Sequence, residues 1–306
     1  MKKLIYNFLN VIKNFNLFFF FKLNIIILKK NYSKYPYYVK KFESALAKEF
    51  GFKYCLTFSS GTAAFYASLL SLNIKKKSKV LVSSLTFPSV IEILKKQNFE
   101  IYFFDIDKNF KTNLKNVINE KYDLLILTHP FGFYIDLKNL KELLNESSKI
   151  IFDSSHSQGI NIKGQNHMKF ADLSFMSLQG NKAISGGEGG VIFTDNEFYY
   201  TQMINNHHPG HVKNMKFKVA GGINDIKLRM HPLAAVIANN DLKSFKKRNN
   251  KLINKVKLIY SHLDSLNIKH PLNDNSNIGG FHFGIPLFLK SDLSSKFIKK
   301  YNWYEN

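Results

Sequence analysis

The chain has 306 residues, 45% of them hydrophobic, which is enough for a large core organised in one or two domains. Its single cysteine excludes a disulfide framework within the chain and any metal site made of several cysteines; we expect no metal site and a reducing, cytoplasmic location. The formal charge of +22 comes mostly from scattered lysines, whereas nucleic-acid recognition favours arginine. We therefore expect no nucleic-acid partner, although such a charge would attract phosphate-bearing substrates.

The first 34 residues form an extension that is both basic and apolar. Its longest apolar run, residues 17–28, is interrupted by Lys22 and Asn24 and is too short for a clean membrane span. The extension begins with basic residues, as a signal peptide does, but it contains no small-residue cleavage site. Two interpretations stay open: residues 1–30 make a weak contact with an anionic membrane surface, or they are a packing arm or a loosely fixed extension.

From about residue 35 onward, short apolar runs alternate with segments of helical periodicity. Apolar runs without strict alternation are typical of strands that are buried on both faces of a sheet. The repeated order of strand, helix and strand predicts an α/β fold with a largely parallel central sheet flanked by helices. We expect strands at residues 80–84, 101–105, 124–128, 150–153, 173–177 and 191–194, and helices at residues 63–72, 89–97 and 137–144.

The pattern changes after His231. Residues 232–263 predict one or two long, lysine-rich helices, which are followed by a loop, a strand at residues 280–286 and a last short helix. We interpret residues 35–245 as a large cofactor-binding domain. Residues 246–306 would then form a small α+β domain that is incomplete.

Ser60, Gly61 and Thr62 precede the helix expected at residues 63–72. Backbone N–H groups at a helix start, the helix dipole and nearby hydroxyl groups together make a site for a phosphate group. Glycine lets the backbone come close to such a group. Taken alone, the segment is also an ordinary helix cap, so its interpretation depends on the segments that follow it.

Asp153 ends an apolar run at the edge of the sheet where parallel sheets bind ligands. Such a carboxylate either caps the next turn or pairs with a protonated ring nitrogen of a ligand. His156 follows three residues later, from where it would contact an oxygen on the same ring. An isolated histidine is more often structural, so this interpretation depends on Asp153.

Lys182 follows the strand expected at residues 173–177, in a glycine-rich loop with small or neutral neighbours. A lysine from which water is excluded has a lowered pKa and reacts with aldehydes. Ser177 ends that strand, and Phe87 follows the strand at residues 80–84, where it would stack on a ligand ring or belong to the core. A phosphate site, a carboxylate for a ring nitrogen and a lysine for an aldehyde are what pyridoxal 5'-phosphate (PLP) requires, so we predict a PLP enzyme.

Eight segments, in the same order, resemble the DegT/DnrJ/EryC1/StrS family of PLP-dependent sugar aminotransferases, which have the fold-type-I architecture. The resemblance covers roughly residues 35–247, most of the chain. The segments are Ser60-Gly61-Thr62-Ala63-Ala64, Thr86-Phe87, Asp105-Ile106-Asp107, His129-Pro130-Phe131-Gly132, residues 153–159, Ser177 with Lys182, residues 187–190 and residues 229–235.

The resemblance implies a role for each candidate residue. Lys182 would bind the aldehyde of PLP and move protons in catalysis, Asp153 would pair with the ring nitrogen, and His156 would contact the phenolic oxygen. Phe87 would stack on the ring. The phosphate would be held by Ser60, Gly61, Thr62 and Ser177 and, in a homodimer whose sites lie at the subunit interface, by an asparagine from the partner, for which Asn224 is the candidate.

The resemblance also implies ping-pong transamination, in which glutamate or glutamine donates an amino group and a keto group of a nucleotide-linked sugar accepts it. Three features depart from the family pattern. Gln179 stands where many relatives have an aromatic residue or His, which would alter the sugar pocket. Ser154 and Ser155 replace a small apolar pair, with no expected consequence, and the chain ends at Asn306, before the small domain would be complete.

Two other functions stay open. A different PLP reaction, such as sugar dehydration, is disfavoured by Lys182, because relatives with that chemistry have His in its place. A truncated, catalytically silent family member with a structural or membrane-associated role is favoured by the short C-terminus and the apolar N-terminal segment. The retention of Asp153, His156 and Lys182 argues against this second alternative.

Overall fold

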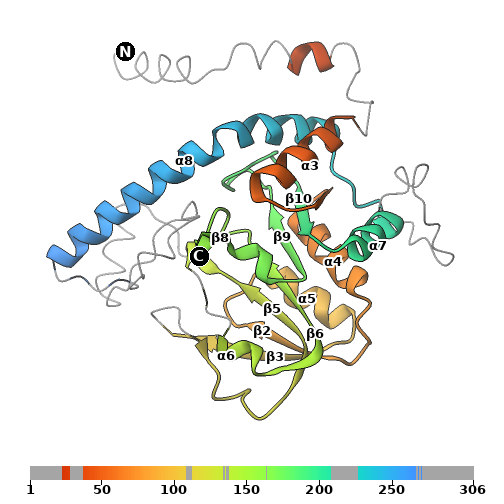
Figure 1. The fold of residues 1–306 in the computed structure, drawn as a ribbon, viewed down its shortest axis with the longest axis vertical. Coiled ribbons are helices and arrows are strands. Elements are labelled where there is room, and N and C mark those ends of the chain that lie inside the picture. The colour runs from red at the N-terminus through yellow and green to blue at the C-terminus, as the bar shows by residue number, and fades with distance from the viewer. Residues whose placement is uncertain are drawn as a thin grey trace.

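The fold is built around one eight-stranded sheet with helices on both faces, as a computed structural model of the chain shows (Figure 1). The structure describes residues 23–27, 37–107, 112–133, 135, 138–162, 164–207, 227–266, 268 and 270.

The helices and strands follow one another along the chain in an alternating order. They are α3 (Tyr37–Phe50), β1 (Tyr54–Phe58), α4 (Gly61–Leu72), β2 (Lys79–Ser83), α5 (Pro88–Lys96), β3 (Glu100–Ile106), β4 (Thr112–Asn113), β5 (Tyr122–Thr128), η2 (Pro130–Gly132), α6 (Lys138–Lys141), β6 (Leu144–Asp153), β7 (Asn161–Ile162), β8 (Gln165–Asn166), η3 (His167–Phe170), β9 (Leu173–Ser177), β10 (Gly190–Thr194), α7 (Glu197–His207) and α8 (Pro232–Ser265).

The strands of the central sheet lie in the order β1-β10-β9-β6-β5-β2-β3-β4. Strands β9, β6, β5, β2 and β3 are parallel neighbours, whereas β10 is antiparallel to both β1 and β9, and β4 is antiparallel to β3. The predicted α/β fold with a largely parallel sheet is therefore confirmed. The carboxyl ends of β1, β2, β5, β6 and β9 meet at one edge of the sheet, where ligands bind in folds of this kind.

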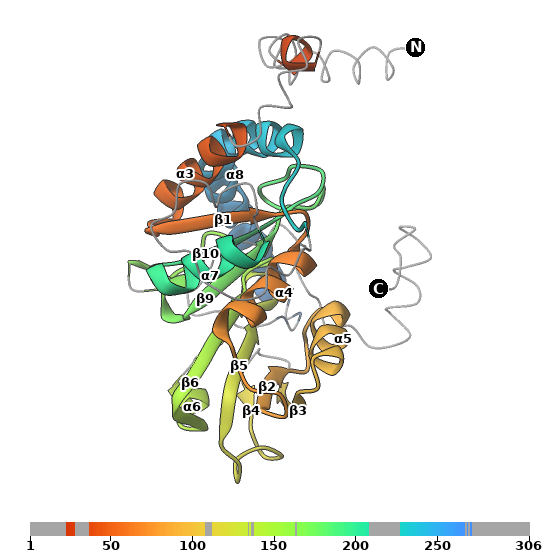
Figure 2. The same ribbon diagram turned by 90° about the vertical axis from the view of Figure 1, so that its right-hand side faces the viewer.

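The strands of the sheet carry apolar residues on both faces, so an apolar layer covers each face. On one face, residues of β1, β2, β5, β6, β9 and β10 pack with α4, α5 and α7. On the other face, α3 and α8 cover β9 and β10, while the segment around α6 covers β2, β5 and β6. Figures 1 and 2 show α3 and α8 side by side at one end of the molecule.

Several elements were not predicted from the sequence, and one prediction was wrong. Among the elements that were not predicted, α3 and β1 precede the first predicted strand, and α7 follows β10. The helix expected at residues 137–144 is a single turn, α6, and Leu144 already begins the ten-residue strand β6. Leu140 and Leu143 are buried in the core beside this strand, so their apolar character reflects burial at the side of the sheet rather than a longer helix.

Helix α8 is one continuous helix of 34 residues. It starts cleanly because Pro232 occupies its first turn and the ring of His231 accepts a hydrogen bond from the N–H of Leu233 at 3.2 Å. The helix runs without a break through residue 245, at which the predicted large domain ends. The strand predicted at residues 280–286 and the last helix lie outside the described residues, so the small domain stays a prediction.

The N-terminal extension is described only at residues 23–27, which are helical. None of the helices in the described part of the chain is both long and apolar enough to cross a membrane. The prediction of a membrane-surface contact through residues 1–30 stays a prediction.

A buried carboxylate joins α3 to β1. Glu43, which is 6% exposed, accepts hydrogen bonds from the backbone N–H of Thr57 at 2.8 Å and from its hydroxyl group at 2.9 Å. Burial raises the pKa of Glu43 from 4.5 to about 7, although the hydrogen bonds from Thr57 and the charge of Lys40 act in the opposite direction. The folded chain therefore holds a proton near pH 6 that the unfolded chain releases.

This difference predicts how stability changes with pH. Because the pKa of Glu43 is higher in the folded state, the free energy of unfolding should fall as pH rises from 4.5 to about 7, by roughly 3 kcal/mol from this group. Glu43→Gln should remove this part of the pH dependence. Urea unfolding at pH 5 and pH 8 measures it, with Glu49→Gln on the exposed face of α3 as the control. Equal pH dependence in both variants would assign the effect to another group.

Candidate active site

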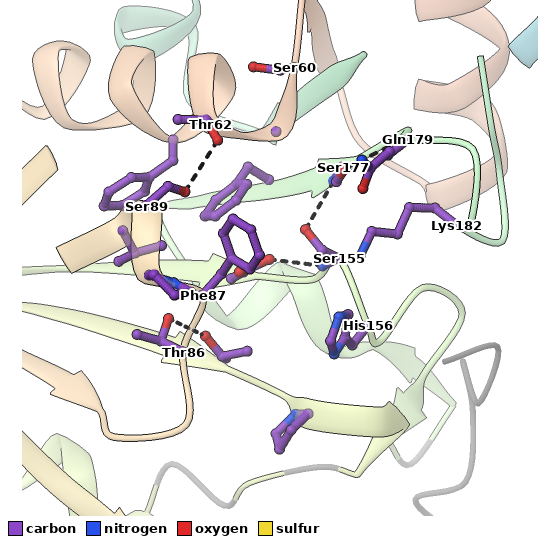
Figure 3. A pocket seen from close by; sticks show the side chains of 18 of the residues that line it. Ser60, Thr62, Thr86, Phe87, Ser89, Ser155, His156, Ser177, Gln179 and Lys182 are labelled. Atoms are coloured by element: carbon purple, nitrogen blue, oxygen red, sulfur yellow. Dashed lines mark hydrogen bonds between the residues drawn. The ribbon is translucent and has the colours of Figure 1, made fainter. Parts of the chain in front are cut away.

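A cavity of about 340 Å³ opens at the edge of the sheet where the parallel strands end. Its walls come from the residues that follow β1, β2, β5, β6 and β9 and from the turn that precedes β10. The predicted residues that line it are Ser60, Gly61, Thr62, Phe87, Asp153, His156, Ser177 and Lys182 (Figure 3). Asn224 lies outside the described residues, so its assignment stays a prediction.

The start of α4 is packed directly against the ends of β9 and β10. A Cβ atom at Gly61 would lie 2.9 Å from the Cβ of Ser177, and one at Gly190 would lie 2.1 Å from the carbonyl oxygen of Ser60. Ser60 caps the helix by accepting a hydrogen bond from the N–H of Ala63 at 3.0 Å. The capping role and the position beside the cavity therefore occur together, and the first N–H groups of the helix lie at the cavity wall.

Asp153 is the buried carboxylate of the cavity. It is 4% exposed, and its Oδ1 accepts a hydrogen bond from the backbone N–H of Ser155 at 3.0 Å. Burial raises the pKa of Asp153 above its ordinary value, while the hydrogen bonds from Ser155 and the charge of Lys182 oppose the rise. A carboxylate in such surroundings gains stability from any cation brought next to it.

Lys182 reaches the cavity from the opposite wall, in the loop between β9 and β10. Figure 3 shows its side chain extended toward Ser155 and His156. Burial lowers the pKa of Lys182, and the charge of Asp153 opposes the change. A lowered pKa increases the neutral fraction of the amine, which is the form that attacks an aldehyde.

A short chain of hydrogen bonds links Asp153 to the end of β9. The N–H of Ser177 donates to Oγ of Ser155 at 3.0 Å, and the N–H of Ser155 donates to Asp153. Beside it, Oγ of Ser154 lies 3.3 Å from Nε2 of the buried His167. No consequence was expected from these two serines, but both of their hydroxyl groups have partners in the structure.

Another part of the cavity wall, away from Lys182, is largely aromatic. Phe87 is 65% exposed and precedes α5, and the ring of Phe131 lies 6.0 Å from that of His156, measured between ring centroids. Phe131 adopts a φ of 51°, which is strained for a bulky side chain. The loop of Lys182 adds Gln179 and Glu188 to the lining.

Several lining residues were not named as site residues from the sequence. Thr86 lies shortly after β2, Thr128 ends the neighbouring strand β5, and their hydroxyl groups form a hydrogen bond at 3.0 Å. Ser89 forms one with Thr62 at 3.2 Å. The signal that would have found Thr86 and Thr128 is their position at or just beyond a strand end. Leu85, Pro130, Phe131 and Ser155 also line the cavity and share this kind of position, whereas Glu188 lies just before β10.

The sequence profile of the DegT/DnrJ/EryC1/StrS aminotransferase family matches residues 22–300. The chain belongs to this family. GDP-perosamine synthase of Escherichia coli O157:H7 is 28% identical over 172 residues, which are 55% of this chain and 47% of that protein. A Campylobacter jejuni UDP-4-amino-4,6-dideoxy-N-acetyl-beta-L-altrosamine transaminase is 26% identical over 166 residues, 52% of this chain and 44% of that protein. The chain thus matches about half the length of these relatives.

Solved structures share the fold. GDP-4-keto-6-deoxymannose-3-dehydratase, with a trapped PLP-glutamate geminal diamine, has a TM-score of 0.74 and 20% identity, covering 87% of this chain and 76% of its own. NtdA from Bacillus subtilis, with bound PMP, has a TM-score of 0.72 and 22% identity, covering 87% of this chain and 61% of its own. The predicted PLP-dependent transferase fold type I agrees with these likenesses.

The close backbone contact at Gly190 predicts a local loss of stability on substitution. Gly190→Ala should lower the free energy of unfolding by about 1–3 kcal/mol or more, because the added methyl group meets the Ser60 carbonyl group. Gly180→Ala is the control, because its Cβ would lie 3.9 Å from the nearest atom. Urea unfolding measures both, and similar losses in the two variants would contradict the packing argument.

Proposed function

We propose that the protein is a PLP-dependent aminotransferase that moves an amino group from glutamate or glutamine to the keto group of a nucleotide-linked sugar. One observation carries the proposal: Asp153 and Lys182, which end or follow different strands, line one cavity, and burial shifts their pKa values in opposite directions. Burial favours the neutral form of each group, as is common at sites of proton transfer and nucleophilic attack.

The residues of the cavity fit PLP. Its phosphate group would be held at the start of α4 by backbone N–H groups and by the hydroxyl groups of Ser60, Thr62 and Ser177. Only glycine at Gly61 leaves the helix start in its close contact with Ser177. The carboxylate of Asp153 matches the protonated ring nitrogen, and the exposed ring of Phe87 offers a surface for stacking.

The cofactor, when bound, supplies an electron sink for the carbon that gains or loses the amino group. Asp153 would keep the proton on the ring nitrogen, because its buried carboxylate gains most from a neighbouring cation. Nζ of Lys182 would bind the aldehyde carbon and, when free, would move a proton at the reacting carbon. His156 would contact the phenolic oxygen, and its ring is packed beside Phe131.

The substrate classes are supported by the relatives. Two of them are named as enzymes that form amino sugars carried by GDP or UDP, and one of the solved structures with this fold holds a trapped adduct of PLP and glutamate. The sugar would lie against the open side of the cavity, where Gln179 and Glu188 offer polar groups for its hydroxyl groups. A cytoplasmic location would give access to such nucleotide-linked sugars.

We also propose that the protein acts as a homodimer. Among the described residues that line the cavity, Lys182 is the only lysine or arginine, so the two negative charges of a phosphate group have little local compensation. A partner subunit would supply further donors to this end of the cavity, and Asn224 is the candidate donor from the partner.

Trapping of the cofactor on Lys182 tests the proposal most directly. Purified protein mixed with PLP should show a visible absorption band, and borohydride should fix the cofactor on the peptide that contains Lys182. Lys182→Ala should lose both the band and amino transfer while keeping its fold, since the nucleophile is removed. Lys96→Ala, at an exposed position on α5, is the control. No labelled lysine in the wild-type protein would make a catalytically silent family member the leading interpretation.

Asp153→Asn tests the carboxylate separately. The variant should still capture PLP on Lys182 but should transfer amino groups at least about 100-fold more slowly, because the ring nitrogen would lose its proton. Glutamate half-reactions followed by absorbance measure the rate. A nearly normal rate would mean that Asp153 acts only as a cap for the following turn.

A further inference from the structure

The tip of the loop that carries Lys182 is attached to helix α8. This loop, residues 178–189, is hereafter called the lysine loop. Its base is closed by backbone hydrogen bonds from Leu178 to Gly189 at 2.8 Å and from Gly186 to Leu178 at 2.9 Å. Hydrogen bonds tie its tip to Asp241 and Arg248 of α8.

Asp241 and Arg248 hold the residues on both sides of Ile184. The N–H of Ser185 donates to Oδ2 of Asp241 at 3.0 Å, and Nη2 of Arg248 donates to the carbonyl oxygen of Ala183 at 2.6 Å. The two side chains also pair with each other, because Nη1 of Arg248 lies 2.9 Å from Oδ1 of Asp241. The planar guanidinium group thus bonds the loop and the carboxylate at once, which a lysine ammonium group would do less well.

Apolar packing accompanies this clamp. Ile184 is fully buried, in the same apolar cluster as Ala235, Ala238 and Leu242 of α8. Packing of one isoleucine fixes where the loop tip lies, but it leaves the direction of the backbone on either side less restricted. The hydrogen bonds at Ala183 and Ser185 are directional, and Ala183 is the residue next to Lys182.

We propose that Asp241 and Arg248 are positioning residues, which hold the backbone next to Lys182 so that its amine points into the cavity. The inference rests on the proposed function for the role of Lys182, while the clamp itself rests on these contacts alone. A displacement of about 1 Å at a reacting group can lower rates by around 100-fold. Loss of the clamp should therefore slow the capture of PLP by Lys182 strongly and lower the free energy of unfolding only slightly.

Arg248→Met tests the clamp, because methionine keeps much of the apolar stem and removes the hydrogen bonds. We expect amide hydrogen exchange in peptides covering residues 178–189 to become faster in the cofactor-free protein. We also expect borohydride-trapped PLP on Lys182 to accumulate about tenfold to 100-fold more slowly. Lys247→Met, a matched change at the neighbouring exposed position, should leave both measurements as in the wild-type protein.

Two further variants separate positioning from general loss of structure. Arg248→Lys should restore part of the capture rate, and Asp241→Asn combined with Arg248→Met should be less than additive, because both act on one clamp. Wild-type exchange in the lysine loop of Arg248→Met would overturn the inference, whatever the rate of PLP capture. So would faster exchange with an unchanged capture rate. If the wild-type protein captures no PLP, the proposed function fails, and the exchange measurement alone decides whether the clamp exists.

Discussion

The site depends on one backbone contact, between the start of α4 and the neighbouring ends of β9 and β10. Phe58, Gly190 and Ser177 are partners across three adjacent strands, so the chain entering α4 passes directly over Gly190. There is no room for a Cβ atom at Gly190, and at Gly61 it would press against Ser177. Close approach of the two backbones is therefore the condition under which the N-terminus of α4 and the lysine loop share one cavity wall.

Hydrogen bonds connect this contact to the carboxylate of Asp153. Ser177 donates to Ser155, and Ser155 donates to Asp153, so the end of β9 fixes the turn after β6. Asp153 is also aligned with Thr128 on one side and with Phe175 on the other. Burial destabilises the charged form of Asp153, and the hydrogen bonds from Ser155 and the charge of Lys182 offset this only in part. A cationic ligand beside the carboxylate would stabilise it further.

The sequence predicted those parts of the molecule that depend on local patterns. Continuous apolar runs predicted six strands, and their last residues led to Asp153 and Ser177. Helix α3 was missed even though Val39, Phe42, Leu46 and Phe50 are buried at helical spacing, because three lysines and other polar residues separate the apolar positions in the sequence. Strand β1 was missed because its five residues include Cys and Thr and form only a short apolar run.

Contacts between distant segments were not predictable in this way. Spacing along the chain gives no distance between Ser155 and Ser177, which are 22 residues apart, or between Asp241 and Ser185, which are 56 apart. Such pairs depend on the order of strands in the sheet and on where a helix crosses it. One sequence without its structure contains no direct signal for either of these features.

Helix α8 contacts three segments of the site. Asp241 and Arg248 hold the lysine loop, while Val256 and Tyr260 pack against Phe133, just after the turn that carries Phe131. Between them, the side chains of Phe245 and Asn249 approach Gly159 so closely that a Cβ atom there would lie 2.7 Å from Nδ2 of Asn249. Gly159 closes the segment that starts at Asp153. One unbroken helix makes all these contacts, so the loop of the lysine, the segment after the carboxylate and the aromatic wall are all packed against the same rigid element.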